Sequence, residues 1–150
     1  MKTIRLLPLE LRRLLQSRPT WLILLLTVAS PVLGLTLYRP ASADTMLSLY
    51  LANPSIAGGA AGGILFGLLT IYELDRVGRS RADALMDAAV SPLTMALVRL
   101  LALLATAVMT VTLTMLVWLP ISMRLIGSVF GGVDYALAYL LLMGLALPLS

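Results

Sequence analysis

Cysteine and histidine are both absent from this chain of 150 residues, and its only lysine is Lys2. Without cysteine there can be no disulfide, thiolate metal site or thiol catalysis, and without histidine the common zinc, haem and catalytic-triad arrangements are excluded as well. Charged residues are scarce at 12%, against about a quarter in an ordinary soluble domain. With 60% hydrophobic residues and a mean hydropathy of +1.00, the chain is suited to a lipid bilayer.

Four long apolar runs account for this hydropathy. The first three contain uncharged stretches of 20, 28 and 24 residues, and the fourth offers 16, with Pro148 near its end. A helix needs about 20 residues to cross the hydrocarbon core, so we predict an all-α, polytopic transmembrane helical bundle that forms a single domain. The predicted spans are 19–38, 55–72 (after an Asn53-Pro54 turn), 92–119 and 135–150. Because the fourth span is short or truncated, we expect the chain to be the N-terminal portion of a longer protein.

The basic residues alternate in number between these runs. Five precede the first run, one follows it, four follow the second and one follows the third. Basic flanks are retained on the cytoplasmic side, so this pattern predicts that the N-terminus and the segment from Glu73 to Arg99 are cytoplasmic. The same asymmetry explains the net charge of +4, and no aromatic residues interleave with the basic ones, so no nucleic-acid partner is expected.

The segment before the first span has its own pattern. Leucines recur at helical spacing at Leu7, Leu11, Leu14 and Leu15, with charged residues between them, up to Pro19. This pattern predicts an amphipathic helix over 7–18 that lies in the membrane interface, with its leucines among the acyl chains. The alternative is a flexible basic N-terminus.

The second and third spans carry two stripes of small or polar residues. Gly59, Gly63 and Gly67 share one helix face, which permits close helix packing, either within one bundle or against another subunit. Thr106, Thr110 and Thr114 share a face of the third span. They could line a polar path, but bonding back to the carbonyl one turn earlier is the favoured interpretation. Trp21 and Trp118 are expected at the two membrane interfaces.

The cytoplasmic segment between the second and third spans has two helix-start signals. Ser80 and Asp83 form a capping box that predicts a short helix over 81–89, and Ser91 with Pro92 predicts the start of the next helix. Leu85 and Met86 give the short helix an apolar side. Its charged residues are Arg81, Asp83 and Asp87. Such an element is either a rigid elbow or a docking surface.

In this order of elements the chain resembles the membrane subunit (permease) of an ABC-2 type transporter, a bacterial ABC exporter. The positions that match the family pattern are Glu73, Arg76, Gly78, Arg79, Leu85, Ser91 and Pro92. Two features depart from that pattern. The serine and proline occur here as Ser91-Pro92, the reverse of the usual order, and family members have six spans.

The resemblance implies a function and a set of partners. Segment 7–18 would be the elbow helix, and 81–89 the coupling helix, which docks on a separate cytoplasmic ABC ATPase subunit. The implied docking residues are Arg81, Asp83, Leu85, Met86 and Asp87. The implied coupling segment comprises Glu73, Asp75, Arg76, Gly78, Arg79, Ser91 and Pro92. The further partners would be a second permease copy or homologous half and membrane lipids, in the bacterial inner membrane.

No Walker A loop is present, so ATP and Mg would bind the partner subunit, and this chain would hold no cofactor or metal and would not be an enzyme. Two other interpretations stay open. One is a membrane scaffold or assembly protein without transport. The other is an integral membrane phosphotransferase that holds a divalent metal through Asp83 and Asp87, which lie four residues apart on one helix face.

Overall fold

The computed structural model describes residues 2–37, 45, 47–79 and 91–149, and each regular element in these ranges is a helix. The elements in chain order are α1 (Lys2–Leu15), α2 (Arg18–Ala29), α3 (Val32–Thr36), η1 (Ser48–Ala52), α4 (Asn53–Arg79), α6 (Pro92–Ile126), η2 (Gly127–Val129) and α7 (Gly132–Leu149).

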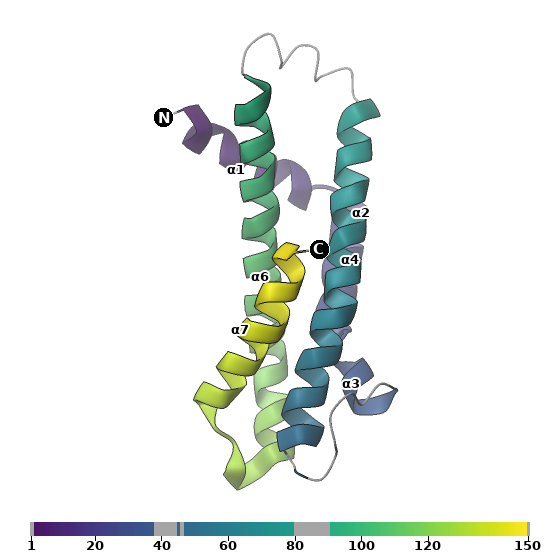
Figure 1. Ribbon diagram of the computed structural model, residues 1–150, viewed down its shortest axis with the longest axis vertical. Coiled ribbons are helices and arrows are strands. Elements are labelled where there is room, and N and C mark those ends of the chain that lie inside the picture. The colour runs from purple at the N-terminus through teal and green to yellow at the C-terminus, as the bar shows by residue number, and fades with distance from the viewer. Residues whose placement is uncertain (1, 38–44, 46, 80–90, 150) are drawn as a thin grey trace.

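Four helical stretches in the described ranges are long and apolar enough to cross a membrane. They are Arg18–Thr36, Ser48–Arg76, Pro92–Val129 and Gly132–Leu149. The predicted all-helical architecture with four apolar spans is therefore confirmed, and it gives the chain the character of a membrane protein. α4, α6 and α7 run along the long axis of the molecule, with α7 in front of α6, and α1 lies across the long helices (Figure 1).

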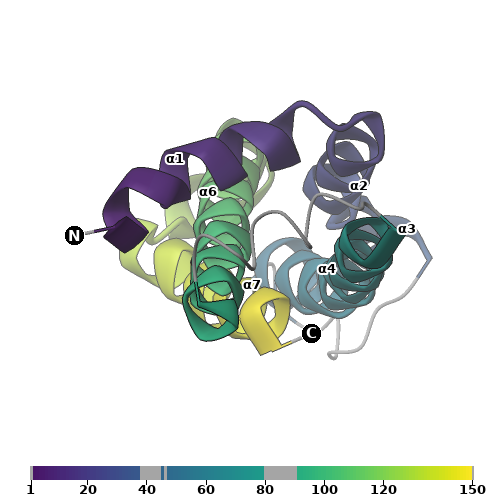
Figure 2. The ribbon, with the colours of Figure 1, turned by 90° about the horizontal axis from the view of Figure 1, so that it is seen from above.

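The transverse helix α1 is longer at its start than the predicted 7–18. It runs from residue 2 through Pro8 and ends before Ser17, whose hydroxyl accepts the Thr20 N–H and so caps α2. Viewed from above, α1 passes over the bundle close to α6, which is its main packing partner (Figure 2). The serine cap forces the chain to turn there from the transverse direction into the bundle direction.

We predicted a single span over 19–38. In the structure the helix of this span is interrupted at Ser30 and Pro31, between α2 and α3. Pro31 has no N–H to donate to the Thr27 carbonyl, and Ser30 replaces it with its backbone N–H at 3.2 Å and its hydroxyl at 2.7 Å. The Ser30 hydroxyl also lies 3.3 Å from the Gly58 carbonyl of α4. The interruption is thus satisfied locally and held against the neighbouring helix.

The second span begins earlier and ends later than the predicted 55–72. We expected a turn at the Asn53-Pro54 pair, and this prediction is wrong. The π-helical η1 passes directly into α4 at Asn53. Pro54 has no N–H to donate to the preceding turn, so the helix continues there with one backbone hydrogen bond fewer. α4 then continues as helix to Arg79, so the residues from Glu73 to Arg79 are helical.

The third span is also longer than predicted. α6 has 35 residues, or about 52 Å, and continues beyond 119 through Pro120 to Ile126. As predicted, Ser91 caps its start, where the hydroxyl accepts the Thr94 N–H, with Pro92 in the first turn. After η2, α7 begins at Gly132, three residues before the predicted start of the fourth span.

The core lies where α7 fits between its neighbours. α4 packs mainly on α7, α2 and α3, whereas α6 packs mainly on α1, α7 and α2. α7 presents a buried row at every fourth residue, formed by Tyr135, Tyr139, Met143 and Leu147. The Tyr135 hydroxyl donates to the Met115 carbonyl of α6 at 2.6 Å. α7 therefore joins α4 and α6, which is the arrangement that positions the charged end described next.

Candidate functional site

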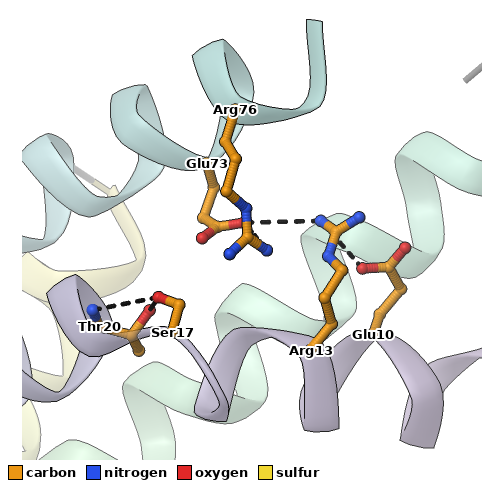
Figure 3. A network of polar contacts seen from close by, with 6 residues as sticks. All are labelled: Glu10, Arg13, Ser17, Thr20, Glu73 and Arg76. Atoms are coloured by element: carbon orange, nitrogen blue, oxygen red, sulfur yellow. Dashed lines mark hydrogen bonds and ion pairs between the residues drawn. The ribbon is translucent and has the colours of Figure 1, made fainter. Parts of the chain in front are cut away.

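Charged side chains from three helices converge at the end of the bundle that α1 crosses. Glu10 and Arg13 come from α1, Glu73 and Arg76 from α4, and Arg99 from α6. We call these five residues the charge cluster. The four residues from α1 and α4 are linked by ion pairs, and Figure 3 shows how the two helices bring their side chains together.

Glu73 is the centre of the charge cluster. Its Oε2 lies 3.0 Å from Nη2 of Arg76 on the same helix and 3.5 Å from Nη2 of Arg13 on α1. Arg13 Nη2 also lies 3.1 Å from Glu10 Oε2, one turn earlier on α1. The chain of contacts therefore joins the transverse helix to the end of the second span through side chains 60 residues apart.

Both carboxylates are buried, Glu10 with 6% and Glu73 with 5% of its surface exposed. A buried carboxylate is costly unless positive charge and hydrogen bonds compensate it. Arg13 and Arg76 meet that need while keeping about a third of their own side-chain surface exposed, 36% and 30%. The position of α1 therefore depends on its ion pair with α4 as well as on apolar packing.

A pocket of about 30 Å³ lies inside the charge cluster. It is lined by Glu10, Arg13, Leu14, Thr70, Glu73, Leu74, Arg99 and Leu103. Arg13 Nε and Glu73 Oε1 are buried polar atoms of this lining that make no hydrogen bond within the described ranges. The lining therefore includes both a donor and an acceptor for a small polar group.

The buried face of α1 differs from the leucine face that the sequence predicted. Leu14 is buried against the protein rather than among acyl chains, and Glu10 is buried on the same side, four residues earlier. Leu9 is 63% exposed. α1 therefore packs on the bundle with a mixed polar and apolar face, in which Arg13 of the same helix compensates the charge of Glu10.

The predicted coupling segment falls partly within the described residues. Glu73, Asp75, Arg76, Gly78 and Arg79 all lie in the last turns of α4, with Asp75 exposed and Glu73 and Arg76 in the charge cluster. Ser91 and Pro92 open α6. The end of α4 and the start of α6 lie at the same end of the molecule, above the level at which α1 crosses (Figure 1).

The predicted docking helix lies outside the described residues. This applies to the range 81–89 and to all five of its predicted docking residues: Arg81, Asp83, Leu85, Met86 and Asp87. The metal-binding alternative through Asp83 and Asp87 falls in the same range. Within the described ranges, no group of three or more acidic, cysteine or histidine residues could hold a metal ion.

The glycines of α4 face helices of the same chain. A Cβ added at Gly59 would lie 2.6 Å from the Leu142 carbonyl oxygen of α7, and one added at Gly63 would lie 3.5 Å from the Ala146 carbonyl oxygen. Gly67, the third predicted packing residue, is partly buried. The α4–α7 contact therefore uses the close backbone approach that small residues permit.

The threonine stripe of α6 bonds back within the helix. The hydroxyls of Thr106, Thr110 and Thr114 donate to the carbonyls four residues earlier at 2.8, 2.7 and 2.8 Å, and all three residues are buried. The favoured interpretation of this stripe is confirmed. A polar path along it would need hydroxyls that are not already engaged.

The interfacial prediction is wrong for one tryptophan. Trp118 is 5% exposed and lies in the bundle, where its Nε1 donates to the Val28 carbonyl of α2 at 2.8 Å. Trp21, in contrast, is 49% exposed near the end crossed by α1, and its Nε1 donates to the Leu15 carbonyl at 2.6 Å. The indole N–H thus serves a backbone carbonyl at a helix end in both places.

The sequence interpretation did not find that Glu10 and Arg13 are partners of Glu73. The available signal was that acidic residues are rare in this apolar chain, and that five of the seven, Glu10 and Glu73 among them, lie on the side predicted to be cytoplasmic. Arg99, the last residue of the segment predicted to be cytoplasmic, lines the pocket of the charge cluster. No family model, curated protein or solved structure matches this chain.

Proposed function

We propose that this chain is the transmembrane permease subunit of an ATP-driven ABC-2 type exporter of the bacterial inner membrane. The observation that carries the proposal is the ion-pair link from Arg13 of α1 to Glu73 of α4. It ties an amphipathic transverse helix to the helix that leads into segment 80–90. A force applied to that segment by a docked ATPase would reach the second span and the transverse helix together.

The start of α6 supports the same proposal. Ser91 and Pro92 fix the first turn of α6, and Arg99, two turns further on, returns to the charge cluster. Both helices that flank segment 80–90 are therefore connected to α1. α4 is connected to it by an ion pair, and α6 is connected to it by extensive packing. Such a three-helix junction would convert movement of the segment into movement of two spans.

ATP would be bound and hydrolysed by the partner subunit, since the chain has no Walker A loop. A second permease copy or homologous half would pack on a surface other than the glycine face of Gly59 and Gly63, because α7 of the same chain already occupies that face. This chain would bind no cofactor of its own.

The proposal predicts that an ATPase with a Walker A loop is encoded beside this chain, and docking is tested by co-expressing the two subunits. The double variant Leu85→Asp and Met86→Asp should abolish co-purification of the two subunits. The matched control, Val129→Asp with Val133→Asp, places the same charges on exposed residues at the opposite end and should leave the complex intact. A complex that survives the first pair, or is lost with both pairs, contradicts docking through 81–89.

Orientation is tested separately, since the natural chain has no cysteine to interfere. Single cysteines at the exposed Gln16 and Ser128 report on the two ends of the bundle. In intact cells a membrane-impermeant thiol reagent should label the cysteine at 128, and the cysteine at 16 only after permeabilisation. The reverse pattern would overturn the proposed orientation.

A further inference from the structure

The pocket of the charge cluster is small and is bounded by α1, α4 and α6. Its volume is about 30 Å³. Pockets for drug-sized ligands start at about 300 Å³, whereas a cavity of about 10–15 Å³ is enough for one water molecule. The size of the pocket therefore favours water as its occupant.

Two polar atoms of the lining residues have no hydrogen-bond partner within the described ranges. They are Glu73 Oε1 and Arg13 Nε, and both are buried. Glu73 as a whole is 5% exposed, so bulk water has little access to its free oxygen. A buried acceptor or donor that is left unpaired bears the cost of its lost hydration. A molecule that both donates and accepts hydrogen bonds would remove this cost at both atoms.

The form of the ion pair between these two residues leaves its second half open. Arginine and carboxylate groups frequently pair through two parallel hydrogen bonds. Here Nη2 of Arg13 faces Oε2 of Glu73 at 3.5 Å, and this is a single, long contact (Figure 3). The other nitrogen and the other oxygen are the two unpaired atoms. The pair is therefore suited to completion by a bridging molecule.

Thr70 adds a second acceptor to the lining. Its hydroxyl donates to the Phe66 carbonyl at 3.0 Å, so its proton is engaged while its oxygen can still accept. Thr70 lies three residues before Glu73 on α4, a spacing that places the two side chains on the same side of the helix. With Arg13 Nε as donor, the lining offers three hydrogen bonds, which is the usual number for a buried water.

The charges of the lining favour a neutral molecule over an ion. The four ion-paired residues of the charge cluster, two arginines and two glutamates, carry no net formal charge. The fifth, Arg99, has an interaction of its own. The apolar part of the lining consists of Leu14, Leu74 and Leu103. An ion buried there without a counter-charge would cost far more than a neutral molecule that is hydrogen-bonded.

From these features we infer that the pocket holds an ordered water molecule that joins α1 to α4. The water accepts from Arg13 Nε and donates to Glu73 Oε1 and to the Thr70 hydroxyl oxygen. It completes the interhelical pair, whose direct contact is 3.5 Å long. This inference does not depend on the transporter proposal or on an ATPase.

The test is solid-state NMR of the full chain in lipid bilayers, with isotope-labelled arginine. Magnetisation is transferred from water protons to the arginine Nε–H groups, and the loss of one signal in Arg13→Lys identifies that of Arg13. We expect transfer to Arg13 Nε–H in the natural chain. The transfer should persist when a gadolinium chelate is added to the aqueous phase, because the bound water is out of reach of the chelate.

Two threonine variants test whether the water lies in this pocket. Thr70→Leu removes one partner of the water and places an apolar group in the lining, so the transfer to Arg13 Nε–H should be lost. The matched control is Thr112→Leu, the same substitution at an exposed residue of α6 outside this pocket, and it should leave the transfer unchanged. Circular dichroism verifies that both variants keep their helix content.

A crystal structure of the natural chain gives a second measurement that needs no variant. It should show a water molecule within hydrogen-bond distance of Glu73 Oε1. A direct contact between Arg13 Nε and a Glu73 oxygen, or an ion or a side chain in the pocket, would contradict the inference. So would the absence of transfer to Arg13 Nε–H in the natural chain, quenching of that transfer by the chelate, or equal transfer in Thr70→Leu and Thr112→Leu.

Discussion

Replacing Glu73 by glutamine removes the charge that Arg13 and Arg76 share while preserving the size of the side chain. At an effective dielectric constant of about 20, the contacts at 3.5 and 3.0 Å are each worth about 5 kcal/mol before desolvation is subtracted. The carboxylate is buried, but the arginines keep 36% and 30% of their surface exposed and regain hydration when they are released. The expected loss of stability is therefore about 2 kcal/mol, between the values for exposed and buried pairs.

Two measurements follow the effect of Glu73→Gln. Reversible unfolding in mixed micelles, monitored by circular dichroism, gives the free energy of unfolding. Spin labels on cysteines at the exposed Leu9 of α1 and Ile71 of α4 give the distance between the two helices. In the variant this distance should become longer and more broadly distributed, because α1 loses its ionic link to α4.

The matched control is Asp134→Asn, the same type of change at an exposed residue in the first turn of α7, which should alter stability by less than about 1 kcal/mol. A double-mutant cycle with Arg13→Gln isolates the interhelical pair. Unchanged stability and an unchanged distance in Glu73→Gln would refute the view that this carboxylate holds α1 in place. So would a coupling energy of zero in the cycle.

Two further predictions concern the packing of the spans. Gly59→Ala should destabilise the chain by more than about 2 kcal/mol, because its Cβ would lie 2.6 Å from the Leu142 carbonyl oxygen. Gly144→Ala, where no atom lies within 4 Å of the added Cβ, should be neutral or stabilising, and equal effects in the same micelle assay would contradict this. Trp118→Phe should cost about 1 kcal/mol through loss of the bond to the Val28 carbonyl, measured by the same unfolding curves; no loss would show that the bond contributes nothing.

Hydropathy and local signals were sufficient to predict much of the fold. Apolar runs of about 20 residues identified the four spans, and Ser91 with Pro92 identified the start of α6. The intrahelical bonds of the threonines follow from residue type and helix geometry, so they were predictable as well. These features depend on residues that are near one another along the chain.

Features that depend on distant residues were not predictable in the same way. The Asn53-Pro54 pair has the composition of a turn, yet contacts with α3 hold it within a continuous helix, since the Gly34 backbone lies against the Asn53 carbonyl. Trp118 has the residue type of an interfacial anchor and is instead buried beside α2. Local preferences were overridden in both places by tertiary packing.

The charge cluster illustrates the same limit at the candidate site. Helical periodicity assigns Glu10 to the polar face of α1, and polar faces of interfacial helices ordinarily face water. Its burial depends on α4 and α6 being adjacent to α1, which no pattern in residues 2–15 encodes. The residues of the site were visible in the sequence, but their convergence was not.

The interruption at Ser30 and Pro31 has a consequence for biosynthesis in the membrane. The Val28 carbonyl beside it receives its side-chain donor from Trp118, which is synthesised 90 residues later. A carbonyl without a donor in hydrocarbon costs several kcal/mol, so the first span is incomplete when it leaves the insertion machinery. We therefore expect the first span to reach its final packing only after the third span has been synthesised, so that the two spans assemble together rather than strictly in sequence.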